Sequence, residues 1–276
     1  MRFSYRRSYE GPLQAVVLDW AGTTVDYGCC APAAVFVEVF RRQGVEISTA
    51  EARAPMGTHK KVHIRELTQM PQVAARWQKT HGRPSSEEDV QAMFEEFVPL
   101  QCEAVSNYAD LIPGTMKTIE ACRQRGLKIG STTGYTSEMM EVVKREAKTH
   151  GYEPDCTVCA DEVPAGRPEP WMCLENAKQL GVYPLKSVVK IGDTKPDVLE
   201  GLNAGMWTIA VAKTGNEMGL NEVEVADLPA SDYERRLERA RQCLAESGAH
   251  YVVDSIADVM TCLDDIGVRL ARGEHP

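Results

Sequence analysis

Strands and helices alternate along most of this chain, and that alternation restricts its fold more than any other feature. After Pro113 and Gly114, helix-spaced segments are separated by short apolar runs. The expected helices cover residues 115–126, 137–151, 169–181, 195–205, 233–248 and 255–271, and the expected strands cover 13–20, 127–134, 155–161, 187–194, 207–212 and 250–255. Such alternation predicts an α/β fold, with a doubly wound parallel sheet and helices on both faces.

A helical segment interrupts this pattern after the first strand. Helical spacing occurs at 33–43, 59–69, 71–82 and 85–105, with no convincing strand between them. Ser86 and Asp89 suit the start of the last of these helices. We therefore expect residues 28–105 to form an inserted all-helical cap domain, and residues 1–27 and 106–276 to form the α/β core.

The composition argues against several classes of partner. A net charge of −9 disfavours a nucleic-acid partner, because such proteins need a clustered basic face. No run approaches the roughly 20 apolar residues of a membrane span. The basic first 14 residues lack the apolar core of a signal peptide and are expected to form a short disordered lead-in. Nine scattered cysteines, an odd number, indicate reduced thiols in a cytoplasmic protein.

Chemically active residues stand at three predicted strand ends, where open α/β sheets bind their ligands. Asp19 opens the motif DWAGTTVD, Thr133 belongs to STTG, and Asp193 belongs to IGDTKPD. The STTG hydroxyl and backbone amides suit phosphate oxygens. Asp193 and Asp197, four residues apart at a helix start, offer oxygen ligands that suit Mg²⁺. The alternative is that Asp19 and Asp193 only cap the segments that follow them.

A fourth motif, GRPEP at residues 166–170, opens a predicted helix. Arg167 within it would neutralise charge on a phosphoryl group, unless it is an exposed loop arginine. Together the four motifs resemble the haloacid dehalogenase-like superfamily. That resemblance implies a Rossmann-like core and Asp19 as a nucleophile that attacks phosphorus and forms an aspartyl phosphate.

One position departs from the usual pattern of that superfamily. In most of its phosphatases the residue two positions after the nucleophile is a second aspartate, which protonates the leaving alkoxide. Here the position is occupied by Ala21, whose methyl group can do no acid–base work. A plain phosphomonoesterase built this way should be badly impaired, so we expect the leaving group to be handled differently.

The helical insert offers another route. The segment PMGTHKKVH at 55–63 places Lys60 and His63 on one helix face, because they are three residues apart. A desolvated lysine can have a lowered pKa and form a Schiff base with a carbonyl substrate. The protonated imine would accept the electron pair of a broken carbon–phosphorus bond. Taken alone, Lys60 would instead be read as a solvated surface lysine, and the neighbouring Lys61 could assist or face solvent.

The chain resembles the phosphonoacetaldehyde hydrolase family from its first strand to near its C-terminus. The similarity lies in DWAGTTVDYG, PMGTHKKVH, STTGY, VPAGRPEPWM, GDT and GAHYVVDS. It implies the hydrolysis of a small phosphonate, phosphonoacetaldehyde, to acetaldehyde and phosphate, through an imine on Lys60 and attack by Asp19.

The same resemblance assigns roles to further residues. It implies that Mg²⁺ is held by the Asp19 carboxylate, the Ala21 carbonyl and the Asp193 carboxylate, with Asp197 in support. The residues expected to contact the substrate are Thr133, Arg167, His63, Met56, Cys29 and Tyr135. A proton relay through His63 is a hypothesis.

The resemblance also suggests a homodimer formed through the cap, where Val35, Phe36 and Phe40 would form an apolar stripe, unless that stripe is packed inside the cap. Three other functions remain as alternatives. A phosphatase or phosphomutase would turn over ordinary phosphate monoesters, and a binding protein would hold a phosphoryl ligand without turnover. A carbon–halogen hydrolase would not need Mg²⁺, and the GDT-containing motif therefore disfavours this third alternative.

Overall fold

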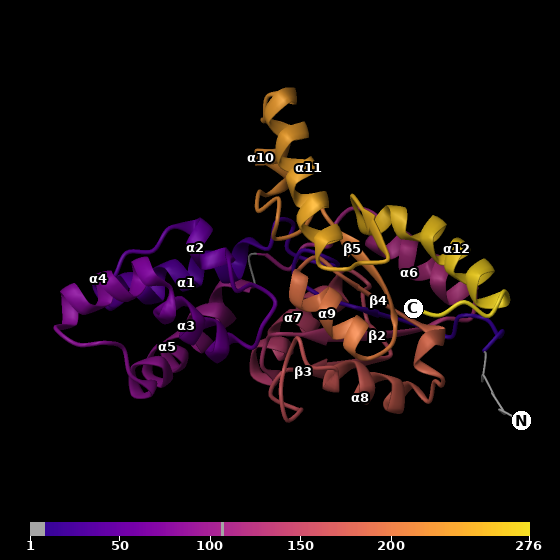
Figure 1. The fold of residues 1–276 in the computed structure, drawn as a ribbon, viewed down its shortest axis with the longest axis horizontal. Helices are drawn as coiled ribbons and strands as arrows, with labels where there is room; N and C mark the ends of the chain where they lie inside the picture. The colour runs from indigo at the N-terminus through magenta and orange to yellow at the C-terminus, as the bar shows by residue number, and fades with distance from the viewer. Residues whose placement is uncertain (1–8, 106–107) are drawn as a thin grey trace, which may run out of the picture.

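The computed structural model describes residues 9–105 and 108–276, and its centre is a parallel sheet (Figure 1). The six strands lie in the order β3-β2-β1-β4-β5-β6. They are β1 (Ala15–Leu18), β2 (Lys128–Thr133), β3 (Cys156–Cys159), β4 (Val188–Gly192), β5 (Trp207–Val211) and β6 (Tyr251–Val253). All five strand pairings are parallel, as the alternation of helices and strands predicts.

The order of the strands explains where the chemistry lies. β1 pairs with β2 on one side and with β4 on the other. The strands after β1 are therefore added first on one side of it and then, from β4 onward, on the other side. Ligands of open α/β sheets bind at such a switch point, beyond the carboxyl ends of the strands. Asp19 directly follows β1 and Asp193 directly follows β4. The fold therefore places these two carboxylates side by side at this edge.

Helices cover both faces of the sheet because its strands are apolar on both sides. Val16 and Leu18 of β1 belong to one core and Ala15 and Val17 to another. The first face packs against α6 (Thr115–Gln124), α7 (Ser137–Thr149) and α12 (Val259–Ala271), and the second against α8 (Trp171–Leu180), α9 (Lys195–Asn203) and α11 (Ala230–Glu246). The doubly wound arrangement is thus confirmed.

Five of the helices between β1 and β2 in the chain lie to one side of the sheet (Figure 1). They are α1 (Cys30–Arg42), α2 (Thr49–Arg53), α3 (Lys60–Gln69), α4 (Pro71–His81) and α5 (Glu87–Val105). We call them the helical insert. Helices α1 and α3 both pack against α5, and α5 also contacts α7 of the core. Val35, Phe36 and Phe40 are buried inside the insert, so they do not form the dimer stripe considered above.

Several element boundaries differ from those expected. Helix α1 begins at Cys30 rather than at residue 33, because the Asp26 carboxylate accepts hydrogen bonds from the Cys30 and Ala31 amides, at 2.9 and 3.1 Å. The short helices α2 and α10 (Glu222–Ala226) were not expected, since five residues are too few to show a period. A 3₁₀ turn at Ile256–Asp258 precedes α12, where one continuous helix was expected.

Two expectations depend on parts of the chain that the structure does not describe. The disordered lead-in falls mostly on residues 1–8, and the second domain boundary falls at residues 106–107. The division into two domains therefore stays a prediction. All nine cysteines are free, as expected of reduced thiols. Within residues 9–105 and 108–276, no helix combines the length and apolar character needed to cross a membrane.

We predict that Gly57→Ala weakens the contact between the helical insert and the core and so destabilises the protein. Gly57 has φ 97°, and a Cβ there would clash with Oγ1 of Thr194 at the start of α9. Steric conflict in a packed contact typically costs about 1–3 kcal/mol. We expect a corresponding loss in the free energy of unfolding, measured with denaturant.

The matched control for this substitution is Gly82→Ala. Gly82 also has a positive φ, 71°, but a Cβ there meets nothing within 4 Å. It therefore carries the backbone cost alone, on the order of 1–2 kcal/mol. Equal losses in the two variants would show that the contact between Gly57 and Thr194 contributes nothing.

Candidate active site

A small cavity lies where the helical insert covers the carboxyl edge of the sheet. It measures about 20 Å³. The residues that were expected in the site and that line it are Asp19, Ala21, Cys29, Met56, Lys60, Thr133, Tyr135 and Arg167. A volume of this size holds about one water molecule. A larger ligand does not fit into the cavity as the structure has it.

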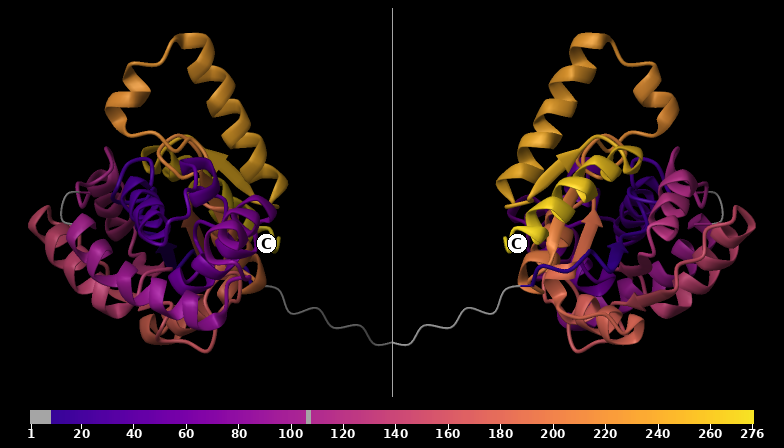
Figure 2. Two further views of the ribbon diagram at one scale, coloured as in Figure 1. Left: turned by 90° about the vertical axis from the view of Figure 1, so that its left-hand side faces the viewer. Right: turned by 90° about the vertical axis from the view of Figure 1, so that its right-hand side faces the viewer.

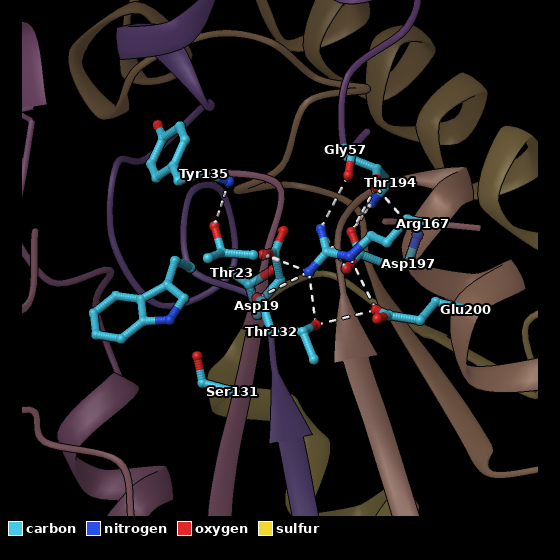
Figure 3. A network of polar contacts seen from close by, with 12 residues as sticks. Asp19, Thr23, Gly57, Ser131, Thr132, Tyr135, Arg167, Thr194, Asp197 and Glu200 are labelled. Atoms are coloured by element: carbon cyan, nitrogen blue, oxygen red, sulfur yellow. Dashed lines mark hydrogen bonds and ion pairs between the residues drawn. The ribbon is translucent and has the colours of Figure 1, made fainter. Parts of the chain in front are cut away.

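Arg167 is buried at the centre of a cluster of carboxylates (Figure 3). Its Nη2 donates to Asp19 Oδ1 at 2.9 Å, and its Nε donates to Glu200 Oε2 at the same distance. Nη1 lies 3.1 Å from Asp197 Oδ1. This guanidinium is therefore held on three sides and is not an exposed loop arginine. Its forked donor geometry suits several carboxylates at once, which a single ammonium would not.

Asp19 and Asp193 are both buried, and each has a raised pKa. Burial raises the pKa of Asp19, and the Arg167 guanidinium opposes that rise. Burial and the charges of Asp19 and Asp197 raise the pKa of Asp193 well above its usual range. Thr194, rather than Asp193, caps helix α9. The capping alternative for Asp193 therefore fails, and its carboxylate instead accepts hydrogen bonds from the Thr23 hydroxyl at 3.0 Å and the Asn216 amide at 2.8 Å.

The cluster has the properties of a divalent-cation site. One oxygen from each of Asp19, Asp193 and Asp197 can be chosen so that all three lie within 4.8 Å of one another. Together with Glu200 they make four buried carboxylates, and within the described part of the chain the only buried cations bonded to them are Arg167 and Lys190. Four carboxylates against two cations leave a formal excess of two negative charges before Lys60 is counted.

The ligand chemistry also fits Mg²⁺, which prefers carboxylate and carbonyl oxygens. A Cβ at Gly22 or at Gly215 would clash with Asp193, so glycine at these two positions lets the backbone approach this carboxylate closely. Lys190 and Thr194 both bond to the Asp197 carboxylate, at 2.7 and 2.5 Å. The less engaged carboxylates of Asp19 and Asp193 would therefore hold the ion. The part of the Ala21 carbonyl stays a prediction.

Lys60 begins helix α3 and is buried, with 4% of its surface exposed. Its Nζ lies 4.8 Å from the centre of the Tyr135 ring. Among the described residues, no hydrogen bond or ion pair to this amine is found. Burial lowers the pKa of Lys60, which favours the neutral, nucleophilic amine. Lys61 instead lies 3.5 Å from Glu87 at the surface, so the two neighbouring lysines have different environments.

His63 is fully buried. It was expected to contact the substrate, but it does not line the cavity. Its Nε2 lies 2.8 Å from the Ala52 carbonyl oxygen, and its ring stacks on Phe36 at 3.7 Å between centroids. Nδ1 has no partner within the described residues. Because a carbonyl only accepts, Nε2 carries the proton. Burial and the charge of Lys60 hold the pKa of His63 well below its usual range, so the ring is neutral.

The two remaining expected contacts, Cys29 and Met56, line the cavity and also pack against Ala33. The packing role is thus observed, and a contact with a substrate stays a prediction. Burial raises the pKa of Cys29 well above its usual range, so this group stays a thiol. Tyr135 donates its backbone amide to Thr133 Oγ1 at 3.1 Å. That bond leaves the hydroxyl proton of Thr133 free to donate to a ligand.

Glu200 is the main residue of the site that sequence reasoning missed. Its Oε2 accepts from Arg167 Nε at 2.9 Å and from Thr132 Oγ1 at 3.0 Å, and Lys190 Nζ lies 3.4 Å away. The three-residue spacing from Asp197 on helix α9 was the available signal. A glutamate inside a helix is ordinarily solvated, so the spacing alone did not identify it.

We predict that Glu200→Ala destabilises the protein by about 3–5 kcal/mol, because removing one member of a buried ionic cluster leaves the others uncompensated. Glu200→Gln keeps the shape and an acceptor oxygen, so its loss should be smaller. The control is Glu175→Gln, which removes an exposed ion pair with Lys178 and should cost less than about 1 kcal/mol. Chemical denaturation measures all three, and a Glu200→Ala variant as stable as Glu175→Gln would refute the role.

Comparison with known proteins agrees with this geometry. The family of haloacid dehalogenase-like hydrolases matches residues 13–205. A phosphonoacetaldehyde hydrolase from Nitratidesulfovibrio vulgaris is 51% identical over 99% of this chain and 98% of that protein. One from Bacillus cytotoxicus is 49% identical over 92% of this chain and 96% of that protein.

A solved structure provides the same result for the whole fold. The crystal structure of a phosphonoacetaldehyde hydrolase-like protein from Oleispira antarctica is 40% identical and covers 100% of both chains, with a TM-score of 0.97. With strand order, site geometry and relatives in agreement, the chain belongs to the haloacid dehalogenase-like hydrolases and, within them, to the phosphonoacetaldehyde hydrolase family.

Proposed function

We propose that this protein hydrolyses the carbon–phosphorus bond of phosphonoacetaldehyde, releasing acetaldehyde and phosphate. The observation that carries the proposal is a buried lysine, Lys60, in the same small cavity as a buried aspartate, Asp19. The names of the relatives support the same substrate. Ala21 supports it as well, because a carbon leaving group does not need the acid–base aspartate of a phosphomonoesterase.

The first step joins the substrate to the insert. The neutral amine of Lys60 adds to the aldehyde carbon, and loss of water together with uptake of one proton from solvent gives a protonated imine. The lowered pKa of Lys60 supplies the neutral amine. The aromatic face of Tyr135, 4.8 Å away, suits the cationic imine that follows.

The second step breaks the carbon–phosphorus bond. A carboxylate oxygen of Asp19 forms a bond to phosphorus, and the electron pair of the broken bond enters the imine, giving an enamine. Arg167 and Thr133 donate hydrogen bonds to the phosphoryl oxygens. When bound, Mg²⁺ supplies positive charge that lets an anionic nucleophile approach an anionic phosphonate.

Water completes the reaction twice. The enamine carbon takes a proton, and water hydrolyses the resulting imine to acetaldehyde and the free Lys60 amine. A second water cleaves the aspartyl phosphate and restores Asp19. His63, neutral and outside the cavity wall, suits a role in packing the helix that carries Lys60 better than it suits a proton relay.

Two further parts of the proposal concern the protein as a whole. We infer a homodimer formed through another surface of the helical insert, because Phe36 and Phe40 are occupied within it. A cytoplasmic location is consistent with the nine free thiols.

Borohydride reduction tests the imine directly. With phosphonoacetaldehyde present, we expect irreversible inactivation and a reduced adduct on Lys60, mapped by mass spectrometry. Lys61→Arg is the matched control and should trap as the wild type does, because Lys61 lies by Glu87 at the surface. Lys60→Arg should give no adduct. Phosphate release without any adduct would move the chemistry to an ordinary phosphatase.

Removal of one carboxylate tests the predicted Mg²⁺ site. Asp193→Asn should weaken Mg²⁺ binding at least about tenfold by calorimetry, because it removes a charged ligand from the cluster. Asp227→Asn removes an exposed carboxylate and should leave Mg²⁺ affinity unchanged. Imine trapping on Lys60 should survive in Asp193→Asn while phosphate release falls. Equal Mg²⁺ affinity in both variants would contradict the assignment.

A further inference from the structure

A groove of about 560 Å³ lies outside the active-site cavity, between helix α2 of the insert and helix α11 of the core. The N-terminal end of α9 and the segment 216–220 complete its walls. Helix α11 projects beyond the rest of the core (Figure 1), and the end views show it as an arch with α10 (Figure 2). The groove is far larger than the roughly 20 Å³ of the cavity.

The charge of the groove is opposite to that of the chain. Its lining contains four cations, Arg53, Lys195, Arg236 and Arg239, and one carboxylate, Glu217. Arg236 and Arg239 are exposed, lie on one face of α11, and make no ion pair with any residue that the structure describes. The chain as a whole carries a net charge of −9. A local excess of positive charge in an acidic protein needs an explanation, since the overall field repels anions.

Two of the polar groups are fixed in position. Arg53 Nη1 donates to the carbonyl oxygens of Gly28 and Cys29, at 2.7 and 3.1 Å, and to Asn216 Oδ1 at 3.2 Å. Its Nε is buried without a partner in the described chain. The Glu217 carboxylate accepts from the Cys243 thiol at 3.0 Å. One carboxylate against four cations leaves the lining of the groove positive, and the cations of α11 remain available.

The groove adjoins the active site. Met56 forms part of the wall of both the groove and the cavity. Thr194 lines the cavity, and the next residue, Lys195, lines the groove. Asn216 in the groove donates its backbone amide to Asp193 at 2.8 Å. The groove and the cavity are therefore neighbours, separated only by Met56 and by the Thr194–Lys195 segment.

We propose that this groove binds a phosphonate or phosphate dianion and transfers it to or from the active site when the helical insert opens. The proposal rests on the proposed function for the identity of its ligand. A cationic groove raises the local concentration of an anionic ligand and its association rate, in a way that salt suppresses. On a protein of net charge −9, such a groove would offset the repulsive field that the ligand meets on approach.

The test removes the two exposed charges of α11. In Arg236→Gln/Arg239→Gln, we expect KM for phosphonoacetaldehyde to rise about three- to tenfold at low salt, with kcat unchanged. At about 1 M salt, where the screening length is near 3 Å, the difference should vanish. Arg236→Glu/Arg239→Glu should show a larger rise. Circular dichroism and the unfolding midpoint establish that both variants fold.

The matched control is Lys79→Gln/Arg272→Gln. It changes the net charge equally, at two exposed residues that do not line the groove. It should leave KM within about twofold of the wild type if the local position of the charges, rather than the net charge, is what matters. Equal salt-dependent KM values in the control and in Arg236→Gln/Arg239→Gln would overturn the proposal.

Inorganic phosphate serves as a second probe and needs no turnover. Its Kd, measured by calorimetry at low salt, should rise in Arg236→Gln/Arg239→Gln and not in the control. A change in KM alone assigns the groove to the incoming phosphonate, and a change in phosphate Kd alone assigns it to the leaving product. If the wild type does not cleave phosphonoacetaldehyde, the proposed function fails, while the phosphate arm still decides whether the groove binds an anion.

Discussion

The contact between the Arg167 guanidinium and the Asp19 carboxylate is the interaction on which the rest of the site depends. It joins the loop before α8 to the end of β1, at 2.9 Å between Nη2 and Oδ1. Without a buried cation, four carboxylates could not be brought together in a space closed to solvent, because the desolvation and repulsion of each would be too costly. Glu200 holds the opposite edge of the same guanidinium, so its direction is fixed before any ligand arrives.

The helical insert approaches this cluster through Gly57, where there is no room for a side chain. Gly57 meets Thr194 at the point where Thr194 caps α9 and bonds to Asp197. Arg53 ties the insert to the chain segment from which it emerges and to Asn216. The position of Lys60 in the cavity that Asp19 also lines is thus set by the backbone contact at Gly57 and by the Arg53 cation, in addition to apolar packing between α5 and α7.

Much of this arrangement could be predicted from the sequence because it depends on local pattern. The strand ends at Asp19, Thr133 and Asp193 follow from strand periodicity and from the geometry of parallel sheets. The alanine at 21 and the lysine at 60 could be read together because a family pattern pairs them. These predictions concern which residues meet, and the cavity brings eight of the ten expected residues together.

The sequence could not predict how deeply each side chain of the site is buried. The spacing of Lys60 and His63 fixes their helix face, but only the packing of Phe36 against His63 shows that the imidazole lies behind the cavity wall. The burial of Glu200 depends on residues from β2 and β4, which are remote in sequence. The five-residue helices α2 and α10 are too short to have a period of their own.

The two reacting side chains come from different parts of the fold, Lys60 from the insert and Asp19 from the sheet. In the proposed mechanism the substrate is therefore covalently attached to one part while its phosphorus is bonded to the other. For the moment before the carbon–phosphorus bond breaks, a two-carbon chain spans the gap between insert and core. The length of that chain would therefore set the distance between Lys60 and Asp19 in the reacting complex. An aldehyde with one more methylene would hold the insert farther from the sheet and admit water.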